Sequence, residues 1–139
     1  MSGNAAPLLP KTALLLIAHG SREKEANADL HHLVAQVRAR GHYGVVEACF
    51  LESAAPTILE GGTRCIDRGA EVVIMLPYFL SAGIHVLRDL TGARTLLAEK
   101  YPHVAIRLAE PMGRHSLLLD IVIQRALEAE ARSAEDISS

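Results

Sequence analysis

The sequence has 139 residues but no tryptophan, and it contains only three tyrosines and two phenylalanines. The core must therefore be built mainly from aliphatic side chains. Base stacking on aromatic rings, a common mode of nucleic-acid binding, is disfavoured. No excess of positive charge is present, since 14 basic residues face 16 acidic ones for a formal net charge of −2. We therefore expect no nucleic-acid partner.

Cysteine and long hydrophobic runs are also scarce. Cys49 and Cys65 are the two cysteines of the chain, and their spacing fits neither a disulfide framework nor a thiolate zinc site. Both lie in apolar stretches, so we expect small buried side chains. The longest apolar runs span about seven residues, far short of a membrane crossing. Residues 1–10 lack the basic segment of a signal peptide. We expect a cytoplasmic protein without membrane contact.

What the sequence does contain is an alternation of two hydrophobic patterns. Residues 12–18 form a continuous apolar run, which is typical of a strand buried on both faces. Residues 22–40 carry apolar side chains at helical spacing, with Ser21 as the expected N-cap and Gly41 as the expected stop. The alternation then repeats and predicts strands over residues 45–51, 71–76 and 104–109, and helices over residues 56–68, 86–100 and 116–131.

This order of elements predicts an α/β fold, because alternating strands and helices give parallel strands joined by right-handed crossovers. We expect a three-layer α/β/α sandwich with a four-stranded parallel sheet. The first and third strands are the most apolar and should be central, which gives the strand order 2-1-3-4 of a flavodoxin-like fold. One domain is expected over residues 12–131, between a flexible leader (1–11) and a polar tail (132–139).

Ligands of such sheets bind beyond the carboxyl ends of the strands, near the point where the strand order reverses. Here that point lies between the first and third strands, where His19 and His85 follow the strand ends. Two imidazoles at this place suit one divalent metal ion, or acid–base chemistry. Glu52 ends the second strand and is either a third ligand, a proton acceptor or a solvated loop charge.

Other residues near the strand ends carry weaker signals. Ser21 and Arg22 open a predicted helix, and a helix N-terminus beside a cation favours anions. The chain contains no phosphate-binding glycine motif and no nucleophile elbow, which disfavours ATP, NAD and α/β-hydrolase chemistry. His115 is expected to be a polar residue at a helix start. Surface positions are expected for the remaining histidines, which are His31, His32, His42 and His103.

Four segments, in matching order and spacing, resemble motifs of the small CbiX/SirB-type sirohydrochlorin chelatases. They are residues 15–22 (LLIAHGSR), residues 50–52 (FLE) with Pro56, residues 77–86 (PYFLSAGIHV) with Asp89, and residues 111–115 (PMGRH). The resemblance covers residues 12–128, and it implies that the chain has a chelatase-like fold. The sequence departs from the family pattern at Ile84, where glycine is common, and at Met112 and Ser116, which replace leucine and proline.

The resemblance implies insertion of a divalent metal into sirohydrochlorin, a tetrapyrrole with eight carboxylates, in cobalamin or sirohaem biosynthesis. It implies Co²⁺ as the expected metal ion, with Fe²⁺ or Ni²⁺ as alternatives. It also implies that the reaction needs neither ATP nor a further cofactor. His19 and His85 match the metal-binding histidines, and Glu52 matches their acidic partner. Larger members carry two such halves, so a homodimer closing a cleft over the macrocycle is implied. Residues assigned to ligand contact are Ser21, Arg22, Ser81, Ala82 and Gly83.

The chemistry of metal insertion adds expectations about charged residues and about pH. Arg22, Arg88 and Arg114 are candidates to pair with substrate carboxylates. Metal-binding imidazoles must be neutral, so activity should fall below about pH 6. One alternative is a non-catalytic module that binds or delivers the metal through the same two histidines. A receiver-like signalling domain is disfavoured, because such a domain needs acidic residues where His19 and Pro77 stand.

Overall fold

The computed structural model describes residues 11–132, in which four strands alternate with four helices. The predicted leader over residues 1–10 and tail over residues 133–139 lie outside the described residues. The strands are β1 (Thr12–Ala18), β2 (Val45–Phe50), β3 (Val72–Pro77) and β4 (Ala105–Leu108). The helices are α1 (Lys24–Arg40), α2 (Ile58–Asp67), α3 (Ile84–Lys100) and α4 (Ser116–Ala131).

The sheet confirms the predicted topology. All neighbouring strands are parallel, and their order is β2-β1-β3-β4. In the register, Leu15 of β1 lies between Glu47 of β2 and Met75 of β3. The five inner residues of β1 are buried, as the continuous apolar run predicts for a central strand.

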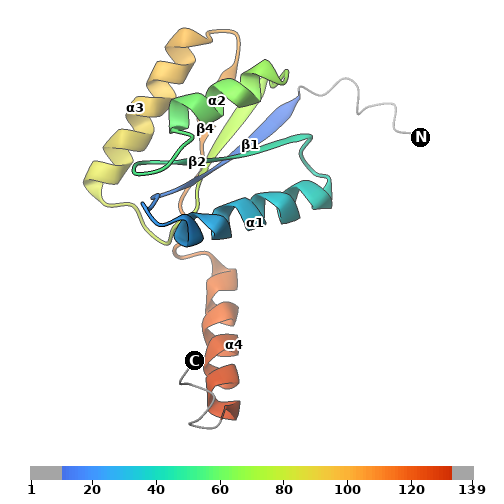
Figure 1. The fold of residues 1–139 in the computed structure, drawn as a ribbon, viewed down its shortest axis with the longest axis vertical. Coiled ribbons are helices and arrows are strands. Elements are labelled where there is room, and N and C mark those ends of the chain that lie inside the picture. Colours follow the sequence, from blue (N-terminus) through green and yellow to red (C-terminus); the bar gives the residue numbers. More distant parts are fainter. Residues whose placement is uncertain (1–10, 133–139) are drawn as a thin grey trace, which may run out of the picture.

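Helices cover the two faces of the sheet unequally (Figure 1). Helix α1 packs on one face, and α2 and α3 pack on the other. The aliphatic core is accordingly split into two clusters by the sheet. The cluster on the α2–α3 side includes Leu15, Ile17, Met75, Leu90 and Leu97. The cluster on the α1 side includes Leu14, Leu16, Leu30, Val34 and Phe50.

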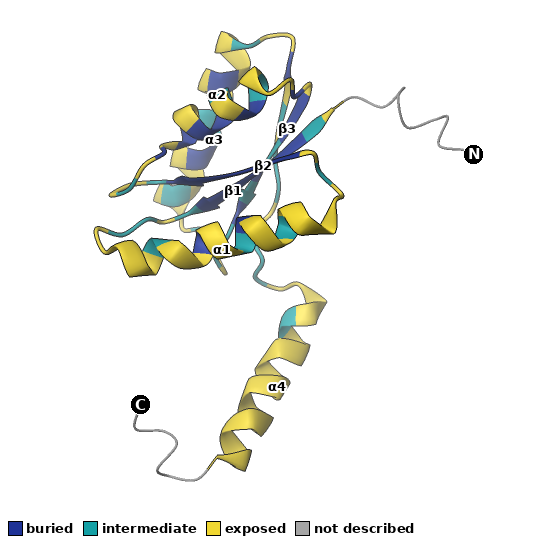
Figure 2. Cartoon of the chain, turned by 45° about the vertical axis from the view of Figure 1, so that its right-hand side comes forward, coloured by how far each residue is buried: buried dark blue, intermediate teal, exposed yellow. Residues whose placement is uncertain are grey.

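The fourth helix differs from the predicted sandwich. Its bounds agree with the prediction, but α4 projects away from the sheet and contains no buried residue (Figures 1 and 2). The three layers are therefore α1, the sheet, and the pair α2 and α3. Within residues 11–132, no helix combines the length and the apolar character that a membrane crossing requires.

The start of the first helix also corrects a prediction. Helix α1 begins at Lys24 rather than at residue 22, and its N-cap is Glu23 rather than Ser21. Ser21 instead accepts a hydrogen bond at its Oγ from the backbone N–H of Glu23, at 3.1 Å. The predicted stop is confirmed, because Gly41 has the left-handed φ of 77° that ends many helices.

The second and third helices each begin two residues away from their predicted starts. Helix α2 begins at Ile58 behind a capping box, in which Thr57 and Glu60 each accept a hydrogen bond from the other's backbone N–H. Helix α3 begins at Ile84, so His85 lies in its first turn rather than in a loop. The bounds of β2, β3 and β4 differ from the predicted ones by one residue at one or both ends. Lys11, predicted as leader, donates from Nζ to the carbonyl of Arg68 at 2.7 Å.

Candidate functional site

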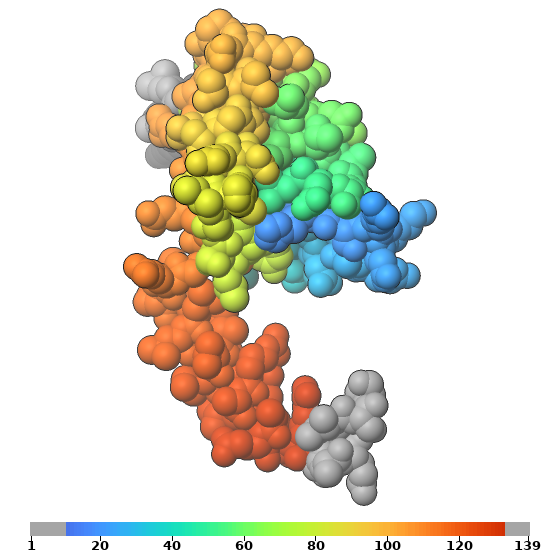
Figure 3. Space-filling model, turned by 90° about the vertical axis from the view of Figure 1, so that its left-hand side faces the viewer, coloured from blue at the N-terminus to red at the C-terminus, as the bar shows by residue number. Residues whose placement is uncertain are grey.

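The loops that follow the four strands meet along the carboxyl edge of the sheet. The backbone N–H of Glu52 donates to the carbonyl of His19 at 3.0 Å, which ties the loop after β2 to the loop after β1. The N–H of Gly113 donates to the carbonyl of Leu80 at 2.7 Å, which ties the loops after β4 and β3. Figure 3 looks onto this edge, where the blue, green and yellow-green segments meet. The edge is therefore one continuous surface.

Gly20 permits the closest of these approaches. Its φ is 95°, a left-handed value that favours glycine. A Cβ atom at this position would lie 1.9 Å from the carbonyl oxygen of Glu52. No other residue fits between the two loops, so Gly20 brings His19 and Glu52 next to one another at the backbone level.

His19 is exposed at the end of β1, and its ring packs against an aromatic side chain from the neighbouring loop. The ring centroids of His19 and Phe79 are 4.6 Å apart, with the planes tilted by 32°. Phe79 is half-buried and packs against the core on the α2–α3 side. The loop after β3 therefore positions the imidazole that follows β1.

His85 is the second residue of α3 and is exposed. The helix starts from Gly83, whose backbone is extended, so the loop after β3 leads directly to this imidazole. Among residues 11–132, no hydrogen bond or ion pair engages the imidazole of His19, that of His85 or the carboxylate of Glu52. All three side chains are therefore open to a ligand.

The described part of the chain does not assemble a set of three metal ligands. No group of three or more histidine, cysteine, aspartate or glutamate side chains within residues 11–132 is arranged to hold a metal ion. The role of Glu52 stays open between third ligand, proton acceptor and solvated loop charge.

Ser21 and Arg22 line a hollow of about 460 Å³ beside the N-terminus of α1. Asn27 holds the loop in place, since its side chain accepts from the N–H of Ser21 at 2.9 Å and donates to the carbonyl of Ser21 at 2.8 Å. Arg22 and Lys24 give the hollow a positive charge, which suits a carboxylate. The complete lining is Ser21, Arg22, Lys24, Asn27, His31, Phe50, Ser53, Ala54 and Ala55.

A second hollow, of about 310 Å³, lies between the loops after β3 and β4. Ser81 and Ala82 line it, whereas Gly83 is the helix cap beside it. Arg114 and Glu110 contribute one charge of each sign. Arg88 lies apart from both hollows, in an apolar groove along α3. The structure therefore places Arg22 and Arg114, but not Arg88, beside hollows at the carboxyl edge.

Three residues of this edge escaped the sequence analysis. Phe79 supports His19, and Lys24 and Asn27 shape the hollow at α1. Phe79 carried a signal, because it is one of only two phenylalanines and sits in a loop. Nothing in the sequence pointed to Asn27, because its hydrogen bonds to Ser21 form only where the folded loop leads into α1.

The other histidines and the cysteines occupy the positions that the sequence predicts. His115 caps α4, where its Nδ1 accepts from the N–H of Leu117 at 3.1 Å. Cys49 and Cys65 are buried and free. Burial raises the pKa of the Cys65 thiol to about 12, with Glu47 as a second cause. Exposed positions are confirmed for His31, His32, His42 and His103.

Comparison with known proteins gives a consistent result. The model of the CbiX family matches residues 13–129. A sirohydrochlorin ferrochelatase of Priestia megaterium is 32% identical over 89% of this chain and 47% of that protein. A sirohydrochlorin cobaltochelatase of Sulfolobus acidocaldarius is 31% identical over 84% of this chain and 90% of that protein.

Solved structures show the same fold. SirB from Bacillus subtilis with Fe³⁺ superposes with a TM-score of 0.79 at 29% identity, over 88% of this chain and 48% of SirB. The chain therefore spans about half the length of SirB and of the Priestia ferrochelatase, and nearly the full length of the Sulfolobus protein.

Proposed function

Because the chain belongs to the CbiX family, we propose that it inserts a divalent metal ion into sirohydrochlorin. The observation that carries the proposal is the placement of His19 and His85 after the two central strands, both exposed on one continuous edge. Relatives that are named ferrochelatases and cobaltochelatases support this reaction class.

Metal insertion requires an ion that is held but still able to exchange. Two neutral imidazoles bind the ion and leave coordination positions free for the ring nitrogens of the macrocycle. A closed set of four protein ligands would retain the ion.

The reaction also releases two protons from the pyrrole nitrogens. The carboxylate of Glu52 is exposed, and its backbone is bonded to that of His19, so it is a suitable proton acceptor at this edge. Arg22 and Arg114 stand in hollows on either side of the central loops and suit the substrate's carboxylates. The residues around Ser21 and Ser81 to Gly83 then contact the macrocycle.

No part of this chemistry needs a nucleotide or a further cofactor. We assign Co²⁺ as the first candidate ion, with Fe²⁺ and Ni²⁺ as alternatives, because imidazole ligands accept all three. The functional unit is proposed to be a homodimer that closes over the macrocycle. The product then serves cobalamin or sirohaem formation.

The test is an anaerobic spectrophotometric assay with sirohydrochlorin and each ion, without ATP. We expect insertion above the protein-free rate, and a loss of at least about 100-fold for His19→Ala and His85→Ala, since each removes half of the ion's protein ligands. His103→Ala, an exposed histidine before β4, is the matched control and should retain full activity.

Two other results would change the assignment. A protein that binds Co²⁺ but leaves the insertion rate at its protein-free value would be a metal-delivery module. Full turnover in both His19→Ala and His85→Ala would remove these residues from the site. Circular dichroism on each variant separates a lost ligand from a lost fold.

A further inference from the structure

The imidazole of His19 is held by a contact with another ring. Its centroid lies 4.6 Å from that of Phe79, and the two planes are tilted by 32°. Rings at this separation and small tilt are offset-stacked, which is attractive beyond the burial of apolar area. Within residues 11–132, no hydrogen bond or ion pair engages this imidazole. In this part of the chain, the phenyl ring is therefore the group that sets the direction of the imidazole.

Phe79 is itself fixed through its backbone and its side chain. The N–H of the preceding residue, Tyr78, donates to the carbonyl of Ile17 at 2.6 Å and extends the pairing of β3 with β1. The carbonyl of Phe79 accepts from the N–H of Met112 at 3.2 Å, in the loop after β4. The side chain of Phe79 packs against the core cluster on the α2–α3 side. A ring anchored in this way is a rigid support for its neighbour.

The main chain of His19 is held from the other neighbouring strand. Its carbonyl accepts from the N–H of Glu52 at 3.0 Å, and the carbonyl of Ala18 accepts from the N–H of Leu51 at 2.9 Å. An exposed side chain on a fixed main chain still exchanges between rotamers. The contact with Phe79 restricts this exchange, so less conformational entropy is lost when a ligand orders the imidazole.

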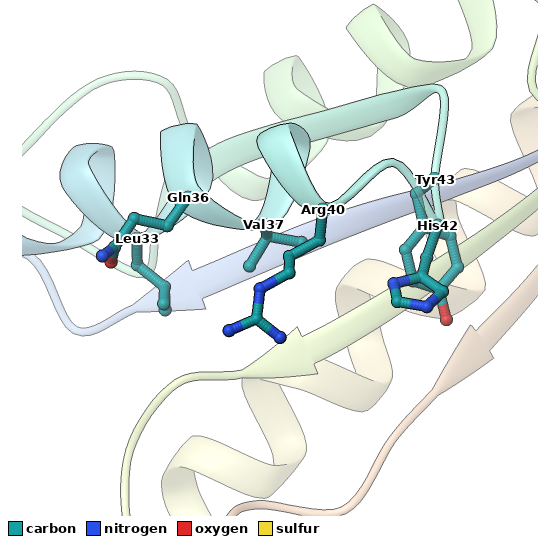
Figure 4. A pocket seen from close by; sticks show the side chains of 6 residues that line it. All are labelled: Leu33, Gln36, Val37, Arg40, His42 and Tyr43. Atoms are coloured by element: carbon teal, nitrogen blue, oxygen red, sulfur yellow. The ribbon is translucent and has the colours of Figure 1, made fainter.

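Other histidines of the described chain lie near aromatic residues in a different way. His31 of α1 meets Phe50 edge-on, with centroids 5.7 Å apart and planes at 64°. His42 stands just before β2 begins, at the opposite edge of the sheet from His19. Figure 4 shows His42 and Tyr43 in the segment after α1, where they line a hollow of about 340 Å³ together with side chains of that helix. Within residues 11–132, the stacked imidazole is thus the one at the end of β1.

We propose that Phe79 is a positioning residue for the metal-binding imidazole of His19. The inference rests on the proposed function, in which His19 is one of two histidine ligands of the ion. Metal-binding imidazoles are usually oriented by a second group, and loss of that group weakens metal binding. At His19 a phenyl ring fills this role, and it acts through packing because it carries no polar atom. Phe79 should therefore strengthen binding of the ion without touching it.

Co²⁺ titration of the full chain is the first test. Phe79→Leu keeps an apolar side chain against the core but removes the flat ring, so we expect about 3- to 10-fold weaker Co²⁺ binding. Phe79→Tyr retains the ring and should restore wild-type affinity. The matched control is Tyr78→Leu, because Tyr78 is also a half-buried aromatic residue of this loop but packs on the α1 side. Its affinity should equal that of the wild type.

Circular dichroism and urea unfolding establish that each variant is folded. Unchanged Co²⁺ affinity in Phe79→Leu overturns the proposal. Equal losses in Phe79→Leu and Tyr78→Leu would show a general effect on the loop and would also overturn it. A Phe79→Tyr variant as weak as Phe79→Leu would mean that the flat ring is not what matters.

Nuclear magnetic resonance of the histidine ring protons tests the contact without metal or substrate. The ring current of the phenyl group acts on the stacked imidazole, so the signals of His19 should shift in Phe79→Leu and stay in place in Tyr78→Leu. Signals of His42, at the opposite edge, are an internal reference and should not move. His19→Ala identifies its signals by their loss. Unshifted His19 signals in Phe79→Leu would overturn the proposal.

The insertion assay separates this inference from the proposed function. In an active protein, Phe79→Leu should raise the KM for Co²⁺ about 3- to 10-fold and leave the KM for sirohydrochlorin unchanged. A loss of kcat with an unchanged KM for Co²⁺ would assign the ring to the chemical step and overturn the positioning role. In a protein that binds Co²⁺ without inserting it, the proposed function fails, and the titration still decides the role of Phe79.

Discussion

Gly20 is part of the motif over residues 15–22, and its backbone helps to set the geometry of the site. A residue with a side chain in the left-handed region costs about 1–2 kcal/mol, and here a Cβ would also strike the carbonyl of Glu52. We expect Gly20→Ala to lower the free energy of unfolding by more than about 2 kcal/mol and to reduce metal insertion. Urea unfolding measures the first effect and the anaerobic assay the second.

Gly41→Ala is the matched control for that substitution. Gly41 has a similar φ of 77°, but a Cβ there meets no atom within 4 Å. We expect a loss of only about 1 kcal/mol, which is the cost of the backbone conformation alone, and unchanged activity. Equal losses for the two variants would show that the contact with the carbonyl of Glu52 does not matter.

The two buried thiols should make the stability of the protein depend on pH in the alkaline range. Burial raises the pKa of Cys65 to about 12, and burial together with the neighbouring Cys65 also raises the pKa of Cys49. In the unfolded chain both thiols ionise near their ordinary pKa of about 8.5. The unfolded state therefore loses protons first as the pH rises. The contribution of the thiols to stability is complete below that pKa and disappears as the pH rises toward the folded values.

We expect the free energy of unfolding to fall from about pH 8.5 upward, by up to about 1.4 kcal/mol per pH unit for each thiol. The double variant Cys49→Ala/Cys65→Ala lacks this component and should show a shallower decline. Urea unfolding of both proteins between roughly pH 7 and 10.5 measures the difference. Parallel curves would contradict the role of the thiols.

Among the elements, α2 shows why a helix propensity alone misleads. Gly61 is expected from propensity to weaken the helix, yet it lies against β1 and β2, where a Cβ would be 2.9 Å from the Cβ of Cys49. Gly92 of α3 is exposed, and a Cβ there meets no atom within 4 Å. The same substitution should therefore have opposite effects in the two helices.

We expect Gly61→Ala to destabilise the protein by about 1–3 kcal/mol through overpacking, and Gly92→Ala to stabilise it by about 0.5–1 kcal/mol. Thermal and urea unfolding of the two variants measure these changes. A stabilising Gly61→Ala would mean that α2 shifts away from the sheet without cost.

The bounds of the helices and strands also explain which parts of the site could be predicted. His19 follows β1 directly, and the end of an apolar run is visible in the sequence. The predicted loop position of His85 was wrong, because α3 begins two residues earlier than its hydrophobic spacing indicates. The cap of α1 was wrong for a related reason. Ser21 is engaged by Asn27 through tertiary hydrogen bonds, which no local pattern reveals.

At the scale of the whole molecule, the proposed homodimer predicts that stability depends on concentration. Dimerisation stabilises the folded state by mass action, so the melting temperature should rise with protein concentration. Scanning calorimetry over a 100-fold range measures the rise. A constant melting temperature would contradict the proposed homodimer.

The sequence by itself determined the strand order, the α/β class and the edge of the sheet at which His19 and Glu52 lie, because these follow from runs of apolar residues and from the handedness of crossovers. The tertiary structure alone decided the packing of Phe79 on His19, the close contact at Gly20 and the direction of α4. These depend on where loops distant in the chain meet. The apolar pattern of α4 is typical of a buried helix, but only the fold shows that α4 leaves the sheet and has no buried residue.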